Sequence, residues 1–317
     1  GLKALIMTSF GGLFFLGAIL ILFVKSGSFE FDAVGQLSPV LRTLVFVFLM
    51  VSAWAKAAQV PFHTWLPDAM EAPTTVSAYL HAAAMVKAGV YLMARTVDTG
   101  LAVPPAAAIV LGAGAVVTMF VALSYYFVQD DLKRLLAYST IAHLGYVLLG
   151  VALGAMGSQT GLRGGALHVL CHGFGKATLF FCVGAIAWRT GSRSIAALGG
   201  LARSMPLTAA AFFVGVAAVT GVPPFACFWS KFTILAGAMK LPGVSGPLLV
   251  TVVLIESLIS FAWLLYVGQK VLLGERTPAA SVDGDPPPTM SAALVLLMIG
   301  CLVAPLVGLP LVEWIGR

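Results

Sequence analysis

The sequence predicts an all-α fold, a polytopic bundle of membrane helices with inverted repeats and two discontinuous helices. Hydrophobic residues make up 60% of the 317 positions and charged residues only 9%, whereas a soluble domain carries about 25% charged residues. Apolar runs long enough to cross a bilayer core of about 30 Å recur along the chain, with short polar breaks between them. The third observation is a pair of proline-containing interruptions within apolar sequence. Together these features predict one polytopic domain that has lipid as its solvent.

The apolar runs predict ten helices. In lipid, every backbone polar group must be satisfied inside its own segment, so helices are the expected spanning structure. The predicted helices cover residues 4–24, 42–58, 74–96, 104–128, 134–155, 164–188, 206–221, 226–239, 247–272 and 290–310.

The two proline interruptions resemble each other, as V-P-F-H-T-W around Pro61 and V-P-P-F-A-C-F-W around Pro223 and Pro224. Proline removes a backbone donor and breaks a helix locally. Paired broken helices are typical of inverted-repeat proteins with an ion site near mid-membrane, and the alternative is two ordinary proline kinks. We therefore divide the chain into three parts: residues 1–96, the end of a first repeat with a break near 59–65; residues 97–273, a second repeat with a break near 222–226; and residues 274–317, a polar loop and a C-terminal transmembrane helix.

Several ionisable side chains remain inside the predicted spans after every charge that fits a loop is set aside. A charge at the bilayer centre costs roughly 2.5–3.5 kcal/mol on insertion scales, so several in one chain are not accidental. They should face protein or water rather than lipid. These residues are Lys56, His81, Lys87, His168, His172, Lys176, Lys231 and Glu256.

The lysines near the first break have two interpretations. Lys56 directly precedes the break, where freed backbone groups admit water and hydrogen-bond partners, and a lysine so placed can load and release a proton. The alternative is that its side chain reaches a membrane interface, and the same alternative holds for Lys87. His81 and Lys87 are six residues apart on the predicted helix and do not share a face, so they are expected to bracket a water chain without touching.

The third group lies on one helix stripe. His168, His172 and Lys176 follow one another at i, i+4 and i+8, a geometry that suits a proton relay through intervening waters. The spacing also suits two imidazole ligands of a metal or haem, or a purely structural histidine pair. Lys231 follows the second break, and Glu256 is the only acid within a clear span. Glu256 should therefore be protonated or find a cation such as Lys231.

Neither a cofactor nor a metal nor a catalytic residue is predicted in this chain. The four cysteines lie in apolar stretches without C-x-x-C spacing, which indicates packing residues and not a disulfide framework or zinc site. We find no Fe–S cysteine pattern, Rossmann glycine motif or nucleophile–base pair. The net charge of +6 suits a protein edged by anionic lipid, and no nucleic-acid partner is expected.

Four segments resemble a known family. They are A-K-A-A-Q-V-P-F-H-T-W-L-P-D-A-M-E-A-P-T-T-V-S-A-Y-L-H-A-A-A-M-V-K-A-G-V-Y at 55–91, Q-D-D-L-K-R-L-L-A-Y-S-T at 129–140, L-H-V-L-C-H-G-F-G-K-A-T-L-F-F at 167–181 and G-V-P-P-F-A-C-F-W-S-K at 221–231. In this order they resemble the antiporter-like proton-translocating membrane subunits of respiratory complex I. The large subunit of Mrp-type cation/proton antiporters and the membrane arm of energy-converting membrane-bound hydrogenases look similar too.

The resemblance implies two inverted five-helix repeats and a proton route through a central string of polar residues. Lys56 then matches the central lysine of the first broken helix, and Lys231 the terminal lysine of the second. His81 and Lys87 match residues of the following helix, and the 168–176 stripe matches the linking helix. Family members usually carry about five helices before this segment, one of which supplies a glutamate that pairs with Lys56, so the first half-channel is expected to be incomplete here. Glu256 is not a hallmark of the family.

The implied function is a proton or Na⁺/H⁺ translocating subunit of a redox-driven, energy-converting complex, similar to complex I or to a group 4 hydrogenase. It is implied to lie in the cell inner (plasma) membrane as a multi-pass protein, with other membrane subunits, a peripheral redox arm and lipid as partners. Its own chain would catalyse no redox chemistry. The alternative is a subunit of an Mrp-type multisubunit cation/proton antiporter. The buried charges disfavour a third class, a non-conducting membrane scaffold.

Overall fold

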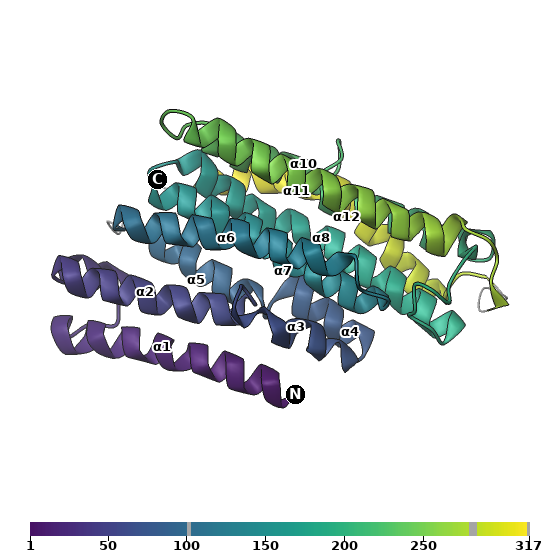
Figure 1. The fold of residues 1–317 in the computed structure, drawn as a ribbon, viewed down its shortest axis with the longest axis horizontal. Coiled ribbons are helices and arrows are strands. Elements are labelled where there is room, and N and C mark those ends of the chain that lie inside the picture. The colour runs from purple at the N-terminus through teal and green to yellow at the C-terminus, as the bar shows by residue number, and fades with distance from the viewer. Residues whose placement is uncertain (100–102, 279–283, 316–317) are drawn as a thin grey trace.

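A computed structural model describes residues 1–99, 103–278 and 284–315 as a bundle of long, nearly aligned helices (Figure 1). Eight helices of this part are long and apolar enough to cross a membrane. The predicted class, a polytopic all-α membrane bundle, is confirmed. The N-terminal helix lies along one edge of the bundle (Figure 1).

The main helices agree with the predicted runs to within a few residues, apart from one interruption. They are α1 (Leu2–Ser26), α2 (Pro39–Lys56), α4 (Thr74–Ala78), α5 (Lys87–Asp98), α6 (Pro105–Tyr126), α7 (Leu132–Ala155), α8 (Gln159–Thr190), α9 (Pro206–Thr220), α10 (Ala226–Ala238), α11 (Ser245–Gly268) and α12 (Pro288–Val312). The shorter elements are η1 (Phe31–Gln36), η2 (Phe62–Thr64), α3 (Trp65–Asp68), η3 (Ala69–Glu71), η4 (Tyr79–Ala83), η5 (Leu201–Arg203) and η6 (Gln269–Leu273).

At the first break, α2 ends at Lys56 and only short helical turns follow up to Glu71. Neighbouring side chains satisfy the backbone groups that the break frees. The backbone amide of Val60 donates to Thr118 Oγ1 of α6 at 3.2 Å. The side-chain Nε2 of Gln59 donates to the backbone carbonyl of Ala57 at 2.9 Å. The Trp65 indole returns to the Ala55 carbonyl at 3.0 Å. Non-helical backbone at membrane depth is tolerated where protein supplies such partners.

The second break separates α9 from α10. The α9 helix ends at Thr220, and Gly221 takes a φ of 91°, a left-handed conformation that glycine adopts without strain. Pro223 and Pro224 then prevent the helix from continuing until α10 begins at Ala226. The Thr220 carbonyl, which lacks a partner in the helix, accepts hydrogen bonds from the side chains of Lys231 and Ser257.

The third interruption corrects the prediction of one continuous helix over 74–96. After α4 the backbone widens into the single π-turn η4, Ala84 leaves helical geometry with φ −133° and ψ −66°, and α5 begins only at Lys87. An alanine-rich run favours helix. The packing of η4 against α8 and of α5 against α2 outweighs this local preference. Gly89 lies so close to the α2 backbone that a Cβ atom would stand 2.5 Å from the Ala53 carbonyl oxygen.

Part of the predicted polar loop, residues 279–283, lies outside the described residues. The next part is tied to the helix that precedes the second break. Asp285 accepts hydrogen bonds from the amides of Leu207 and Thr208 at 2.9 Å each and from Thr208 Oγ1 at 2.8 Å. It therefore caps the N-terminus of α9, where a carboxylate is favoured. The guanidinium of Arg189 also donates to the Asp285 carbonyl, so this end of the loop is anchored.

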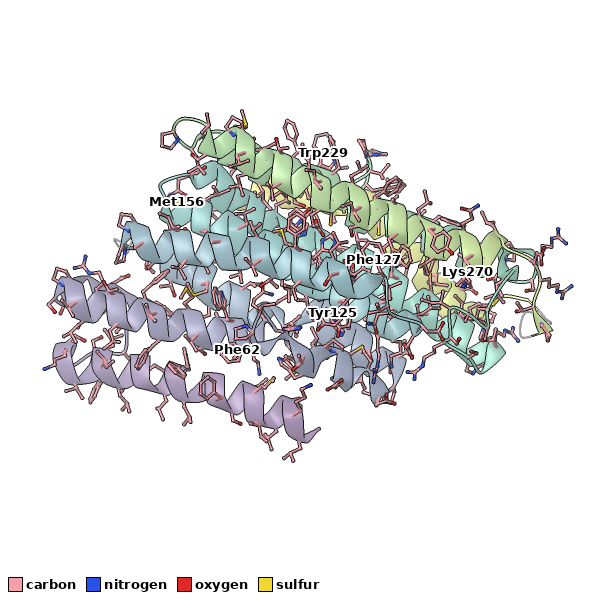
Figure 2. All side chains as sticks on the ribbon, viewed as in Figure 1. Phe62, Tyr125, Phe127, Met156, Trp229 and Lys270 are labelled. Atoms are coloured by element: carbon pink, nitrogen blue, oxygen red, sulfur yellow. The ribbon has the colours of Figure 1, made fainter. Side chains whose placement is uncertain are left out.

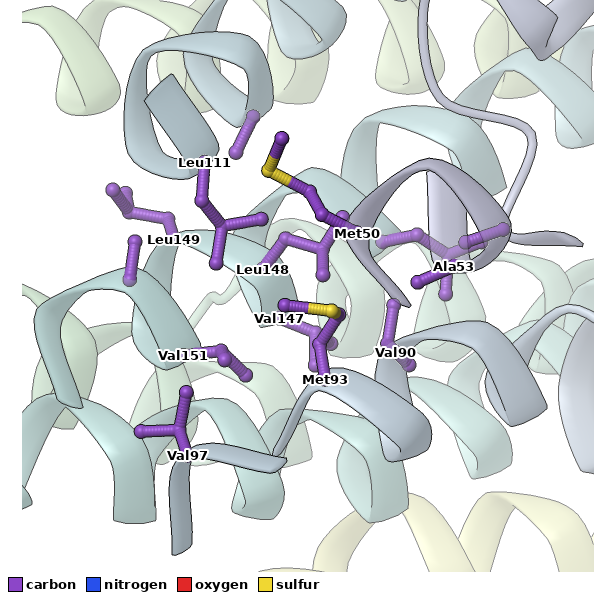
Figure 3. Close-up of a cluster of buried hydrophobic side chains, with 14 of the residues drawn as sticks. Met50, Ala53, Val90, Met93, Val97, Leu111, Val147, Leu148, Leu149 and Val151 are labelled. Carbon is purple, nitrogen blue, oxygen red and sulfur yellow. The ribbon is translucent and has the colours of Figure 1, made fainter. Parts of the chain in front are cut away.

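The centre of the bundle is formed by α7 and α8. All residues in the membrane-spanning stretch of α7 are buried, whereas only 17% of those in the corresponding stretch of α1 are. Met50, Met93, Leu111 and Val147 come from α2, α5, α6 and α7 and meet in one apolar cluster (Figure 3). Outward-facing apolar side chains such as Trp229 cover the surface, as expected for contact with lipid or other membrane subunits (Figure 2).

The α7 and α8 helices touch through glycines. A Cβ atom on Gly150 would stand 2.7 Å from the Gly161 carbonyl oxygen and 2.7 Å from Gly165 Cα. Both neighbours are backbone atoms of α8 that no side-chain rotation can move. Small residues at such contacts allow helix backbones in membranes to approach closely.

We therefore expect Gly150→Ala to separate α7 from α8 and to lower the free energy of unfolding by about 1–3 kcal/mol, the usual cost of overpacking. The measurement is the thermal unfolding midpoint of the detergent-solubilised protein. Gly12→Ala is the matched control, because a Cβ atom there meets no other atom within 4 Å and alanine favours helix. Equal midpoints for the two variants would contradict this account of the contact.

Candidate functional site

A line of buried polar side chains runs through the middle of the bundle. Its members come from η4, α5, α7, α8, α10 and α11, and each is less than a tenth exposed. In the order in which they are described below, they are His168, His143, His172, Lys176, His81, Lys87, Lys231, Tyr146 and Glu256.

Three histidines form the centre of this line. His168 Nε2 lies 3.0 Å from His143 Nδ1, and His168 Nδ1 lies 2.8 Å from Ser230 Oγ on α10. The ring of His172 is 5.0 Å from that of His143 and 6.0 Å from that of His168, centroid to centroid. The structure thus links α7, α8 and α10 through imidazole rings that donate and accept protons.

Sequence reasoning missed His143. It is alone on its helix, with no partner at i+4, so the spacing argument that identified His168 and His172 passes over it. The signal was nevertheless present, because His143 lies well inside the predicted span 134–155. Only the packing of α7 against α8 shows that it completes the cluster.

Lys176 continues the stripe of α8 beyond the histidines. It is fully buried, and its ammonium donates to the Leu136 carbonyl of α7 at 3.2 Å. His81 lies nearby in η4, which packs against α8, and its ring stacks on Phe180 with centroids 4.8 Å apart. Neither ring nitrogen of His81 has a hydrogen-bond partner among the described residues. Such an orphaned polar group is a place for water.

Lys87 begins α5 after the third interruption. Its side chain is buried and its ammonium donates to the Val169 carbonyl of α8 at 2.7 Å. It also borders a cavity of about 440 Å³ that Ala82, Gly173 and Phe174 help to line. In the structure Lys87 thus points at α8 rather than along its helix toward an interface.

Lys56, in contrast, is half-buried at the end of α2. It borders a cavity of about 480 Å³ between α1, α2 and α5, which Thr8, Ser52 and Arg95 also line. The described residues that line this cavity include no Asp or Glu, and Lys56 makes no hydrogen bond or ion pair within the described part of the chain. The structure places its ammonium apart from the central line.

Lys231 and Glu256 lie at the other end of the line. The Lys231 ammonium donates to the Thr220 carbonyl at 3.0 Å and to Ser257 Oγ at 2.8 Å, and it sits 4.4 Å from the centre of the Tyr146 ring. Glu256 is 1% exposed and accepts a hydrogen bond from the Tyr146 hydroxyl at 2.5 Å. Glu256 was expected to be protonated or to pair with a cation such as Lys231, and the direct pair is not among the ion pairs of the described residues. The two residues are connected through Tyr146 and Ser257 instead.

The metal alternative concerns the same histidines. No group of three His, Cys, Asp or Glu side chains that could hold a metal ion occurs in the residues that the structure describes. The nitrogens of His143 and His168 face each other at the separation of a hydrogen bond. The other ring nitrogen of His168 lies against the Ser230 hydroxyl, so the cluster is linked by hydrogen bonds between protein groups.

Comparison with known proteins identifies the family. Residues 1–260 match the family model described as NADH:quinone oxidoreductase/Mrp antiporter, TM. The chain belongs to this family. The resemblance inferred from residues 55–91, 129–140, 167–181 and 221–231 is thereby confirmed.

Curated members of the family include proteins from two kinds of complex. Subunit 5 of the chloroplast NAD(P)H-quinone oxidoreductase of Zygnema circumcarinatum is 40% identical over 260 residues, which cover 76% of this chain and 36% of that protein. One subunit of the Na⁺/H⁺ antiporter of Alkalihalophilus pseudofirmus is 35% identical over 299 residues, which cover 87% of this chain and 37% of that protein. The chain thus spans a little over a third of the length of these relatives.

Two solved structures of family complexes share the fold. A chain of the Mrp complex from a Dietzia species superposes with a TM-score of 0.87 at 32% identity, covering 100% of this chain and 35% of that chain. A chain of the membrane-bound sulfane sulfur reductase, an archaeal respiratory membrane complex, gives a TM-score of 0.82 at 26% identity, covering 98% and 63%. Family members with this fold thus work as parts of multisubunit membrane complexes.

We expect His143→Phe to leave a buried nitrogen of His168 without its partner and to cost about 1–3 kcal/mol of stability. Phenylalanine keeps a ring against Tyr146 and His172, so the loss should come from the hydrogen bond. The measurement is the thermal unfolding midpoint, taken also in a His168→Phe background. There the same change should cost much less, because the partner nitrogen is gone. Equal losses in both backgrounds would show that His143 acts by packing alone.

Proposed function

We propose that this chain is a proton-translocating subunit, or one that exchanges Na⁺ for protons, within a redox-driven energy-converting membrane complex. The observation that carries the proposal is the line of buried lysines and histidines between the second break and the third interruption. Seven of its members were predicted from the sequence as pathway residues, namely His81, Lys87, His168, His172, Lys176, Lys231 and Glu256. His143 and Ser230 join the route on geometric grounds.

The chemistry of the line suits proton movement better than electron or group transfer. Imidazole and amine groups bind and release protons, and neither carries electrons. The rings of His143, His168 and His172 lie within 6.0 Å of one another, centroid to centroid, and His143 and His168 contact each other directly at 3.0 Å. The route we propose runs from Lys87 and His81 through Lys176 and the histidines to Lys231. Lys56 would enter it from the cavity beside α1.

The proposed architecture places the two broken helices in two inverted repeats, with residues 1–96 ending the first and residues 97–273 forming the second. The similar sequences around Pro61 and Pro223 support it, as does the lysine next to each break. The proposed partners are other membrane subunits and a peripheral redox arm, and the proposed location is the plasma membrane. The family's known complexes support the first of these.

We expect Lys176→Met to reduce coupled proton uptake by a factor of about 10² or more, the range in which removal of a proton-transfer group lies. Methionine fills the buried space but binds no proton. The measurement is proton uptake by proteoliposomes that contain the full-length protein with its associated subunits. Lys25→Met is the matched control, since Lys25 is exposed at the end of α1. An assembled Lys176→Met protein that pumps normally would refute the route.

A second candidate function is a role in an Mrp-type antiporter driven by ion gradients alone, favoured by the similarity to the Na⁺/H⁺ antiporter protein of Alkalihalophilus pseudofirmus. Purification of the native assembly separates the two. A redox-driven complex should copurify with a hydrogenase or quinone-reducing activity and pump only when given an electron donor. Proton movement driven by an imposed Na⁺ gradient, in a preparation without electron-transfer activity, would favour the antiporter.

A further inference from the structure

Two buried groups of opposite charge lie close together without pairing. Lys231 is 6% exposed and Glu256 is 1% exposed, yet the ion pairs among the described residues do not include them. The ammonium of Lys231 instead binds Ser257 Oγ, which belongs to the residue that follows Glu256 in the chain. In an interior of low dielectric, opposite charges this near attract each other strongly. An ionised Glu256 should therefore approach Lys231 unless another contact directs its carboxylate elsewhere.

The holding contact is made by Tyr146 of α7. Its hydroxyl donates to Glu256 Oε2 at 2.5 Å, a short, charge-assisted hydrogen bond of the strong kind. The face of its ring covers the Lys231 ammonium at 4.4 Å, a separation typical of a cation–π contact. One side chain therefore engages both charged groups and satisfies each without the other.

The ring of Tyr146 cannot easily turn away from this position. It stacks on His143 and on His168, with centroid distances of 5.7 Å and 5.5 Å, and the side chain is 1% exposed. Its hydroxyl also lies 3.3 Å from the Val253 carbonyl of α11. The histidine cluster thus fixes the ring, and the ring fixes where the carboxylate of Glu256 points.

We propose that Tyr146 is a positioning residue that keeps Glu256 and Lys231 apart, so that Lys231 can release its proton. The inference rests on the proposed function of Lys231 as the end of the route. A direct ion pair would favour the charged lysine and hold the proton on it. With the carboxylate engaged by Tyr146, an ammonium N–H bond of Lys231 breaks, its electron pair stays on nitrogen, and the proton passes to water in the adjoining cavity of about 190 Å³.

That cavity supports the direction of release. It is lined by Tyr146, Thr220, Lys231 and Ser257 together with apolar side chains of α10 and α11. The polar groups of these four residues give a water molecule the two to four partners that it needs. Among the described residues that line it, Lys231 carries the amine, and Tyr146 contacts both this amine and the carboxylate of Glu256.

The test is Tyr146→Phe, which keeps the ring and removes only the hydroxyl that holds Glu256. We expect the freed carboxylate to pair with Lys231 and proton transfer to slow about tenfold, because an ion pair that binds the proton ten times more tightly releases it ten times more slowly. Tyr138→Phe is the matched control, since Tyr138 lies on the same helix and its ring stacks, among the described residues, on Tyr125 and not on the histidines. Proton uptake by proteoliposomes of the full-length protein with its associated subunits is the first readout.

Two further readouts separate positioning from a general structural role. In a Glu256→Gln background, adding Tyr146→Phe should change the rate of proton transfer no further. An undiminished tenfold loss in that background overturns the proposal.

The structure of the Tyr146→Phe protein should show Lys231 Nζ within about 4 Å of a Glu256 carboxylate oxygen, the limit used for an ion pair. Unpaired side chains in that structure overturn the proposal even where Glu256→Gln is itself inactive. This structural readout is independent of pumping. A normally pumping Lys231→Ala protein would refute the proposed role of Lys231 in the route, whereas the structural readout alone decides whether Tyr146 keeps Glu256 away from Lys231.

Discussion

The rest of the structure depends on how a membrane bundle keeps lysines inside it. Burial of an ammonium is costly unless strong acceptors surround it, and Glu256 is the one carboxylate among the described members of the central line. Main-chain carbonyl groups take that role: Lys87 donates to Val169, Lys176 to Leu136, and Lys231 to Thr220. A carbonyl dipole stabilises the ammonium less than a full negative charge does. The lysines are thus held in place without being locked in their charged form.

The breaks in the helices follow from the same constraint. A carbonyl within a regular helix already accepts one hydrogen bond, whereas the Thr220 carbonyl at the end of α9 is left free by Gly221 and the prolines that follow. It can therefore accept hydrogen bonds from both Lys231 and Ser257. At the third interruption, the loss of helical geometry after η4 lets Lys87 reach α8. Interrupted helices and buried cations thus occur together because each interruption provides acceptors or access that an unbroken helix lacks.

The sequence predicts much of this, for reasons of physics. Apolar runs specify membrane helices because lipid leaves no other solution, and Lys176 or Glu256 stands out because a charge in such a run is expensive. The relations between helices are harder to predict. The role of His143 is evident only from its contact with His168 of α8. In the sequence Tyr146 resembles an ordinary core aromatic residue, and only the structure shows its hydrogen bond to Glu256. The interruption before Lys87 lies in a run that favours helix. Each of these depends on contacts between segments far apart in the chain, which no local pattern encodes.

The glycine contact between α7 and α8 has a mechanical consequence. With Gly150 lying directly against the backbone at Gly161 and Gly165, the two helices have no side-chain layer along which to slide or roll. The distance between the His143 and His168 rings is therefore set by direct contact between the two helix backbones. Moving one of these rings relative to the other through a helix shift would require the two backbones to separate first.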